Sequence, residues 1–188
     1  METVLCSVPV EIPGTQMRRK RSEGPLPILP KIAITHLNNW AEKNGFPTCK
    51  FYDVDMLYPS DEEIEKYFKE NKADVVGLSA VVSTSYMQVR RLAQIIKKAN
   101  KNALIVCGGY LTAAANTVLR KTEVDVCVVG DGEVAWVGIL NFMKEHLEKG
   151  KNKIDIDKLL EVKGIAVIDD DKELRFSGYG KRLSDCEM

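Results

Sequence analysis

The fold is decided by three stretches of sequence: Asp74-Val-Val-Gly-Leu-Ser79, Ala103-Leu-Ile-Val-Cys107 and Asp125-Val-Cys-Val-Val129. Each stretch is short and almost continuously apolar, which is typical of a parallel strand covered by helices on both faces. Each ends in small, flexible or hydroxyl-bearing residues. The carboxyl ends of parallel strands form one edge of an open sheet, and ligands bind at that edge. The three stretches therefore predict a ligand-binding edge.

Two further strands complete the predicted sheet, Thr3–Val8 and Thr48–Met56. Apolar periodicity and capping residues predict the intervening helices, which begin near Pro30, Ser60, Tyr86, Thr112 and Glu133. Five strands alternating with helices predict an α/β fold, a doubly wound, Rossmann-like parallel sheet of the flavodoxin type. After Gly150 the pattern changes.

The C-terminal part reads as a β-hairpin, because the apolar runs 164–168 and 173–176 flank the turn Asp169-Asp170-Asp171. We therefore expect a Rossmann-like domain over residues 1–150 and a hairpin with a linker over residues 151–188.

Composition excludes several classes of function. Lysine and arginine total 27, as do aspartate and glutamate, so net charge favours neither a nucleic acid nor an anionic membrane as partner. No apolar run approaches the roughly 20 residues of a membrane-spanning helix. The first residues lack the basic and apolar regions of a signal peptide, so a cytoplasmic location is expected.

The cysteines and histidines offer no catalytic or metal site. The five cysteines are scattered without a C-x-x-C pair, which argues against a disulfide framework, a zinc site or an iron–sulfur cluster built from this chain alone. Cys107 and Cys127 are expected to be reduced and buried. His36 and His146 lie in helix-like segments and are expected to be surface or half-buried residues away from the three loops. The long Pro9–Pro30 stretch is expected to be functional or mobile.

The candidate ligand-binding residues all follow the three strands. They are Ser79, Ser83, Thr84, Ser85, Gly108, Gly109, Tyr110, Val129, Gly130, Asp131, Gly132 and Glu133. Glycines let the backbone approach a ligand closely. Hydroxyls at a helix N-terminus suit a phosphate or an amide.

Other small-ligand folds fit poorly. The first strand is not followed by the G-x-G-x-x-G of dinucleotide-binding folds, and no P-loop motif occurs. The third strand ends in Ser79-Ala80, where a phospho-receiver domain would carry an aspartate. No serine or cysteine has an evident histidine partner for nucleophilic catalysis.

The pattern resembles the N-terminal cobalamin-binding domain of cobalamin-dependent radical S-adenosylmethionine enzymes. The resemblance rests on the Asp74–Ser79 strand with its Ser83-Thr84 turn, on Ile105-Val-Cys-Gly-Gly109, and on Gly130-Asp-Gly-Glu133. It continues into Val162-Lys-Gly-Ile165 and the hairpin. Methionine synthase and the mutases carry D-x-H-x-x-G, whose histidine ligates cobalt, and this chain lacks that motif. Radical enzymes of the family commonly lack it too.

The resemblance implies a domain that binds cobalamin with its nucleotide tail displaced from cobalt and with no protein histidine ligand. The parent enzyme would be a methyltransferase, or would catalyse another radical reaction, using S-adenosylmethionine and a [4Fe–4S] cluster. This chain lacks the C-x-x-x-C-x-x-C triplet that holds such a cluster. We expect a non-catalytic fragment with the radical domain as its partner in cis, or else a stand-alone cobalamin-binding protein. The alternative from another class is a regulatory module that binds a nucleotide or another small ligand at the same edge.

Overall fold

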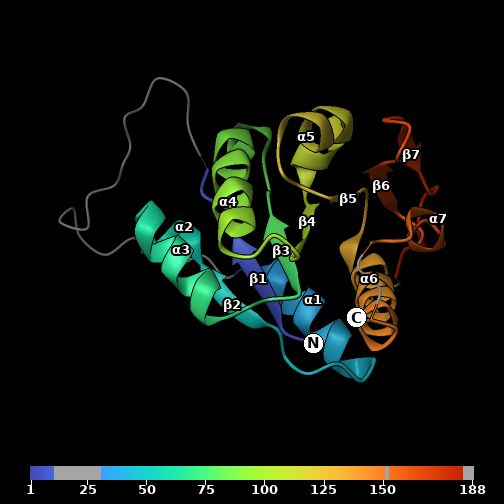
Figure 1. Ribbon diagram of the computed structural model, residues 1–188, viewed down its shortest axis with the longest axis horizontal. Coiled ribbons are helices and arrows are strands. Elements are labelled where there is room, and N and C mark those ends of the chain that lie inside the picture. Colours follow the sequence, from blue (N-terminus) through green and yellow to red (C-terminus); the bar gives the residue numbers. More distant parts are fainter. Residues whose placement is uncertain (11–30, 151–152, 184–188) are drawn as a thin grey trace.

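A computed structural model describes residues 1–10, 31–150 and 153–183. Its centre is a seven-stranded sheet in the order β2-β1-β3-β4-β5-β6-β7 (Figure 1). The strands are β1 (Thr3–Ser7), β2 (Lys50–Asp53), β3 (Val75–Ser79), β4 (Leu104–Gly108), β5 (Val126–Val128), β6 (Ile165–Ile168) and β7 (Leu174–Phe176). Strands β1 to β5 are parallel, and their order is that of the flavodoxin type. The predicted fold class is confirmed.

The predicted C-terminal hairpin is present, and it extends the main sheet. Strand β6 pairs antiparallel with β5, and β7 pairs antiparallel with β6. Strand β6 therefore runs away from the carboxyl edge and β7 runs back toward it. The short helix α7 (Ile156–Leu159), which the sequence analysis did not predict, precedes the hairpin. The predicted boundary at residue 150 stays a prediction.

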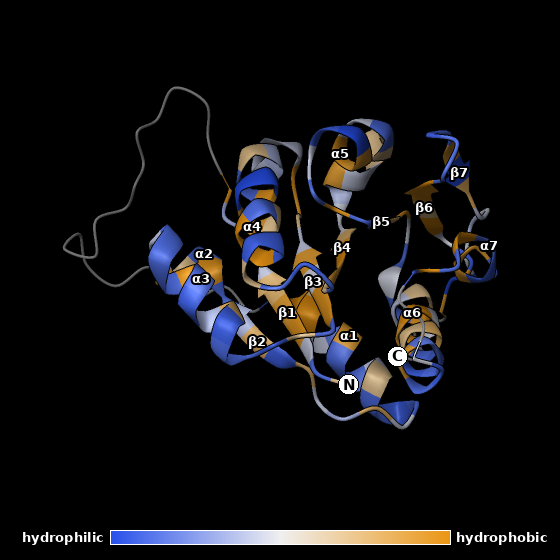
Figure 2. Ribbon diagram, viewed as in Figure 1, coloured by the Kyte–Doolittle hydropathy of each residue, from blue (hydrophilic) through white to orange (hydrophobic). Residues whose placement is uncertain are grey.

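Helices cover both faces of the sheet (Figure 1). One face is covered by α3 (Asp61–Glu70), α4 (Tyr86–Ala99) and α5 (Ala115–Lys121), and the other by α1 (Ile32–Lys43), α6 (Gly132–Glu148) and α7. The cores of the inner strands β1, β3, β4 and β5 are apolar and buried (Figure 2). Helix α3 begins with the predicted capping box, in which Ser60 and Glu63 each bond the other's backbone N–H. No helix in the described residues is long and apolar enough to cross a membrane.

A glycine inside β3 sets how closely α6 packs on the sheet. A Cβ at Gly77 would lie 2.6 Å from Leu5 Cδ2 and 3.2 Å from the six-membered ring of Trp136. Trp136, at the start of the second turn of α6, is 2% exposed. The missing side chain at Gly77 therefore provides the space in which Trp136 packs.

Two predicted elements differ from the structure. The predicted strand Thr48–Met56 ends at Asp53 and is followed by the short helix α2 (Val54–Leu57), because the Asp53 carboxylate caps that helix by accepting from Met56 N–H at 3.1 Å. The helix expected from Thr112 begins earlier, as the 3₁₀ turn η2 (Tyr110–Ala114) that leads into α5. Most of the Pro9–Pro30 stretch lies outside the described residues.

Candidate functional site

The loops after β3 and β4 are joined by backbone hydrogen bonds at the carboxyl edge of the sheet. Ala80 N–H donates to Gly108 O at 2.8 Å, and Val8 N–H, after β1, donates to Ser79 O at 3.2 Å. The buried hydroxyl of Thr112 lies 2.8 Å from both Gly109 O and Val128 O, and so connects the β4 loop to the end of β5. The three predicted loops therefore form one continuous surface, which we call the carboxyl rim.

The glycines of the carboxyl rim have different roles. Gly109 adopts a left-handed conformation with φ of 96°, and a Cβ there would lie 2.3 Å from Ala80 O. It is therefore needed by the turn itself. A Cβ at Gly108 or Gly130 would meet no atom of the described residues within 4 Å. Both positions therefore leave open space for a ligand against the backbone, and Gly130, with φ of 95°, also has a left-handed conformation that favours glycine.

The hydroxyl residues after β3 form a 3₁₀ turn, η1 (Ser83–Ser85), which leads directly into α4. Helix α4 has no acidic residue in its first turn and no side-chain cap, so its positive end is left uncompensated by those groups. Ser85 is 0% exposed, and its Oγ has no hydrogen-bond partner within the described residues. A buried hydroxyl is normally bonded. The first turn of α4 therefore has unused polar capacity.

Large apolar side chains are exposed beside this polar turn. Val81 and Met87 are each 54% exposed, and Tyr110 is 81% exposed. Turns η1 and η2, which carry or flank them, lie in contact. The rim thus offers hydroxyls, open backbone and apolar surface together. This combination suits a large ligand with flat apolar faces and polar side groups.

The β5 loop is held by residues from distant parts of the chain. His36 Nδ1, on α1, lies 3.9 Å from Glu133 Oε1, at the start of α6. The expectation that both histidines lie away from the three loops is therefore wrong for His36, because the packing of α1 on α6 brings it there. Near the C-terminus, Arg182 Nε lies 3.3 Å from Asp131 Oδ2.

Among the described residues, the cysteines of β4 and β5 offer no reactive thiolate at the rim. Burial raises the pKa of Cys127 to about 12 and raises that of Cys107 well above its usual value. Both thiols are neutral and free, and both are buried in adjacent strands. They act as small apolar residues, as predicted from the sequence.

Comparison with protein families identifies the family of this chain. Residues 26–140 match the model of the B12 binding domain. The chain belongs to the B12-binding domain family. The matched range contains all three rim loops and the strands that carry them. The resemblance identified from the sequence is thereby confirmed at the level of the family.

The chain is also similar to individual proteins in sequence or in fold. The anaerobic magnesium-protoporphyrin IX monomethyl ester cyclase of Cereibacter sphaeroides is 27% identical over 145 residues, which are 76% of this chain and 22% of the cyclase. The radical S-adenosylmethionine methyltransferase TsrM of Kitasatospora setae, solved with cobalamin and a [4Fe–4S] cluster bound, has the same fold at a TM-score of 0.70 and 14% identity. That match covers 100% of this chain and 31% of TsrM.

The cobalamin-dependent radical enzyme OxsB, solved with aqua-cobalamin bound, has a TM-score of 0.66 and 17% identity, over 96% of this chain and 22% of its own. The chain thus spans less than a third of each of these relatives.

The structure brings the predicted site residues to one rim, and their contact with a ligand stays a prediction. Sequence reasoning missed Val81, Met87 and His36 at this rim. Val81 and Met87 were readable as apolar residues outside any strand, in the segment between Ser79 and the core of α4. His36 had no such signal, because its position depends on how two helices pack.

Proposed function

We propose that this chain is the cobalamin-binding domain of a larger radical S-adenosylmethionine enzyme, with cobalamin bound at the carboxyl rim. The observation that carries the proposal is the match of residues 26–140 to the B12 binding domain, because that range includes every candidate residue from Ser79 to Glu133. The chemistry of the rim supports the same ligand. Cobalamin combines a flat corrin ring, peripheral amides and a nucleotide tail with a phosphodiester.

Each part of the rim suits one part of that ligand. The nucleotide tail would lie between the sheet and the β3 and β4 loops, where the open space at Gly108 and the hydroxyls of η1 would receive it. The positive end of α4 favours the phosphodiester. The corrin would lie over Tyr110 and over the β5 loop, Val129–Glu133, whose backbone at Gly130 is open.

We propose that cobalt takes no histidine ligand from this chain. His36 Nδ1 faces the carboxylate of Glu133, and His146 stacks on Phe142 near the end of α6, far along the helix from the rim. The sequence also lacks D-x-H-x-x-G. The nucleotide base would then be held away from cobalt by the protein.

The larger enzyme is proposed to be a methyltransferase, in which cobalamin supplies a methyl carrier. S-Adenosylmethionine and a [4Fe–4S] cluster would be held by a radical domain in cis, because this chain spans less than a third of its relatives. Residues 1–150 would form the cobalamin domain, and 151–188 the connection toward the radical domain. This chain by itself would bind the cofactor without turnover.

Cofactor retention tests the proposal. Hydroxocobalamin is mixed with the purified chain, the mixture is desalted, and the protein fraction is scanned for corrin absorbance. We expect corrin bands that co-elute with the protein in a stoichiometric amount. Protein that elutes without corrin bands would contradict the proposal and would favour the alternative, a module that binds a nucleotide or another small ligand at the rim.

A variant pair on the two ends of β4 locates the site. Gly108→Val fills open space at the rim without a left-handed backbone, and should lower cobalamin affinity at least about tenfold, through lost contact with the displaced ligand. Asn102→Val places the same branched side chain in the exposed turn before β4 and should leave affinity unchanged. If both variants bind cobalamin equally well, the cofactor does not contact the β4 loop. Gly109→Val is unsuitable because the turn needs Gly109.

A further inference from the structure

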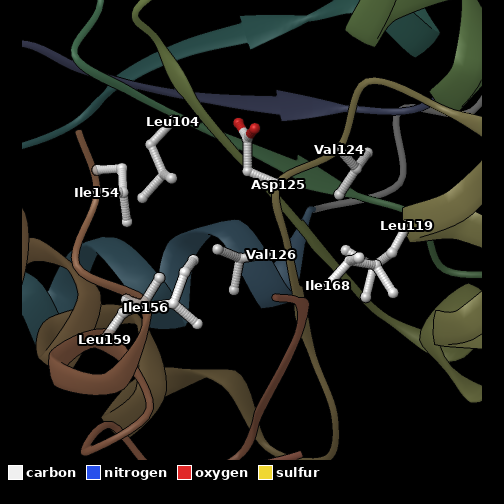
Figure 3. Close-up of a pocket in the computed structure, with 9 residues that line it drawn as sticks. All are labelled: Leu104, Leu119, Val124, Asp125, Val126, Ile154, Ile156, Leu159 and Ile168. Atoms are coloured by element: carbon white, nitrogen blue, oxygen red, sulfur yellow. The ribbon is translucent and has the colours of Figure 1, made fainter. Parts of the chain in front are cut away.

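A cavity lies at the edge of the sheet opposite the carboxyl rim, where β4 and β5 begin and β6 ends. Its volume is about 250 Å³. We call it the amino-edge cavity. It is lined by eight aliphatic side chains and one carboxylate: Leu104, Leu119, Val124, Asp125, Val126, Ile154, Ile156, Leu159 and Ile168 (Figure 3).

The cavity exists because β5 and β6 pair over a short distance. Their ladder consists of Cys127↔Ala166 and Val128↔Ile165, and it does not continue to Val126 and Asp125. Beyond the paired residues, the segments that extend β5 and β6 line the cavity with aliphatic side chains. The floor is buried, with Val126 and Leu159 at 0% and 1% exposure, whereas Ile154, Ile156 and Ile168 are half-buried and flank the opening.

The single polar side chain in the lining is Asp125. Its Oδ2 accepts from Ile105 N–H at 2.7 Å and from Lys97 Nζ at 2.8 Å. Its Oδ1 accepts from Lys97 Nζ at 3.1 Å and has no other partner among the described residues. A carboxylate oxygen can accept two hydrogen bonds, so Oδ1 keeps acceptor capacity. The Asp125 side chain is 35% exposed, so a ligand at the opening can reach it.

Other groups around Asp125 limit what can bind there. Lys97 Nζ also donates to Ala103 O at 2.8 Å, so its ammonium is shared between the carboxylate of Asp125 and a backbone carbonyl. Glu123 raises the pKa of Asp125 as a nearby negative charge, after burial, which is the larger cause. The local charge is therefore two carboxylates against one ammonium, and a cation is the complementary ligand.

We propose that the amino-edge cavity binds a small aliphatic amine, with its hydrocarbon body among the aliphatic side chains and its ammonium on Asp125 Oδ1. An apolar cavity of about 150 Å³ in another protein holds benzene, so this volume accepts a body of about five carbons. The site is independent of cobalamin and of the carboxyl rim.

Methyl NMR on the full chain tests the proposal with 3-methylbutylamine as the probe and 3-methylbutan-1-ol as its uncharged match. We expect saturable shifts of the Ile154, Ile156 and Ile168 methyl signals, while those of Ile64 and Ile96, which do not line the cavity, stay unchanged. The amine should bind at least about tenfold more tightly than the alcohol, because a hydrogen bond between charged groups is stronger. Absence of saturable shifts, or equal binding of the two probes, would overturn the proposal.

Three variants separate the two parts of the site. Asp125→Asn should reduce amine affinity to that of the alcohol. Lys97→Met should raise amine affinity severalfold, because it removes the competing ammonium. Val126→Leu should weaken both probes by filling the cavity, while it leaves Asp125 in place. If Asp125→Asn and Lys97→Met change amine binding in the same direction, the carboxylate is not the ammonium site.

Discussion

The two edges of the parallel sheet are built from the same strands and differ in chemistry. At the carboxyl rim, β3 and β4 run into serines and glycines, a buried hydroxyl has no partner in the described residues, and Tyr110 is exposed. At the amino edge, Lys97, Asp125 and Ile105 N–H form a bonded cluster beside an aliphatic cavity. Hydrogen-bonding groups at the rim are left without protein partners, whereas most of those at the amino edge bond to one another in the folded protein. Substitutions at the rim should therefore change ligand binding, and those at the amino edge should change stability.

Gly109 is the strongest exception to this division, because it is a rim residue that the fold needs. Gly109→Val forces a branched side chain into a left-handed backbone and against Ala80 O, and should destabilise the protein by about 2 to 5 kcal/mol. Urea unfolding measures this loss. Gly108→Val is the control and should stay within about 1 kcal/mol of the parent. Equal stability of the two variants would contradict the assigned role of Gly109.

Lys97→Met tests the amino edge. The substitution keeps most of the length of the side chain but leaves the Asp125 carboxylate without its cation, so the free energy of unfolding should fall by about 1 to 3 kcal/mol. Cobalamin retention should not change. Lys98→Met is the control, because Lys98 pairs with Glu65 on the surface, and it should leave stability nearly unchanged. If Lys97→Met loses cobalamin but keeps normal stability, the proposed division of roles between the two edges is wrong.

The pH dependence of the same variant sharpens this prediction. Burial raises the pKa of Asp125 even beside Lys97. A carboxyl with a raised pKa stabilises the fold fully below the ordinary pKa of aspartate, and this contribution is lost as pH rises through the raised value. Removing Lys97 raises that pKa further. The stability difference between parent and Lys97→Met should therefore grow between about pH 4 and pH 7. Thermal unfolding at a series of pH values checks the sign, and a difference that shrinks with rising pH would contradict it.

The smallest expected effect compares two buried hydroxyls at the rim. Ser85→Ala removes an Oγ that has no partner in the described residues, so stability should stay constant or rise by up to about 1 kcal/mol, while cobalamin retention falls. Thr112→Val removes the hydroxyl proton that Gly109 O and Val128 O share and should cost about 1 to 2 kcal/mol. If Ser85→Ala destabilises the protein as much as Thr112→Val, Ser85 has a structural role and is not reserved for the ligand.

The sequence was sufficient for the elements whose signal is local. Continuous apolar runs identified β3, β4 and β5 to within one residue at each end, and the Ser60/Glu63 pair identified the start of α3. The end of β2 was wrong because the apolar pattern continues through Val54 and Met56, while the Asp53 side chain caps a helix there. The apolar pattern predicts which residues are buried, whereas the capping side chain determines whether the backbone is strand or helix.

Features that depend on tertiary packing could not be predicted in this way. The placement of His36 beside Glu133 follows from how α1 packs on α6, and the pairing of β6 with β5 follows from how the hairpin returns to the sheet. The distinct roles of Gly108 and Gly109 depend on a backbone angle and on the position of Ala80 O. Adjacent glycines look alike in a sequence.

The glycine in the middle of β3 has a consequence for the cofactor site. Gly77 sets the depth at which Trp136 enters the interior, and Trp136 lies four residues after Gly132 on the same rigid helix, about 6 Å along its axis. The position of the β5 loop relative to the sheet therefore depends on an interior contact, that of Trp136 with Gly77 on β3. A methyl group added at Gly77 would clash with Leu5 and press on Trp136, and any shift of Trp136 would be carried along α6 to the loop at Glu133 without a change at the rim itself.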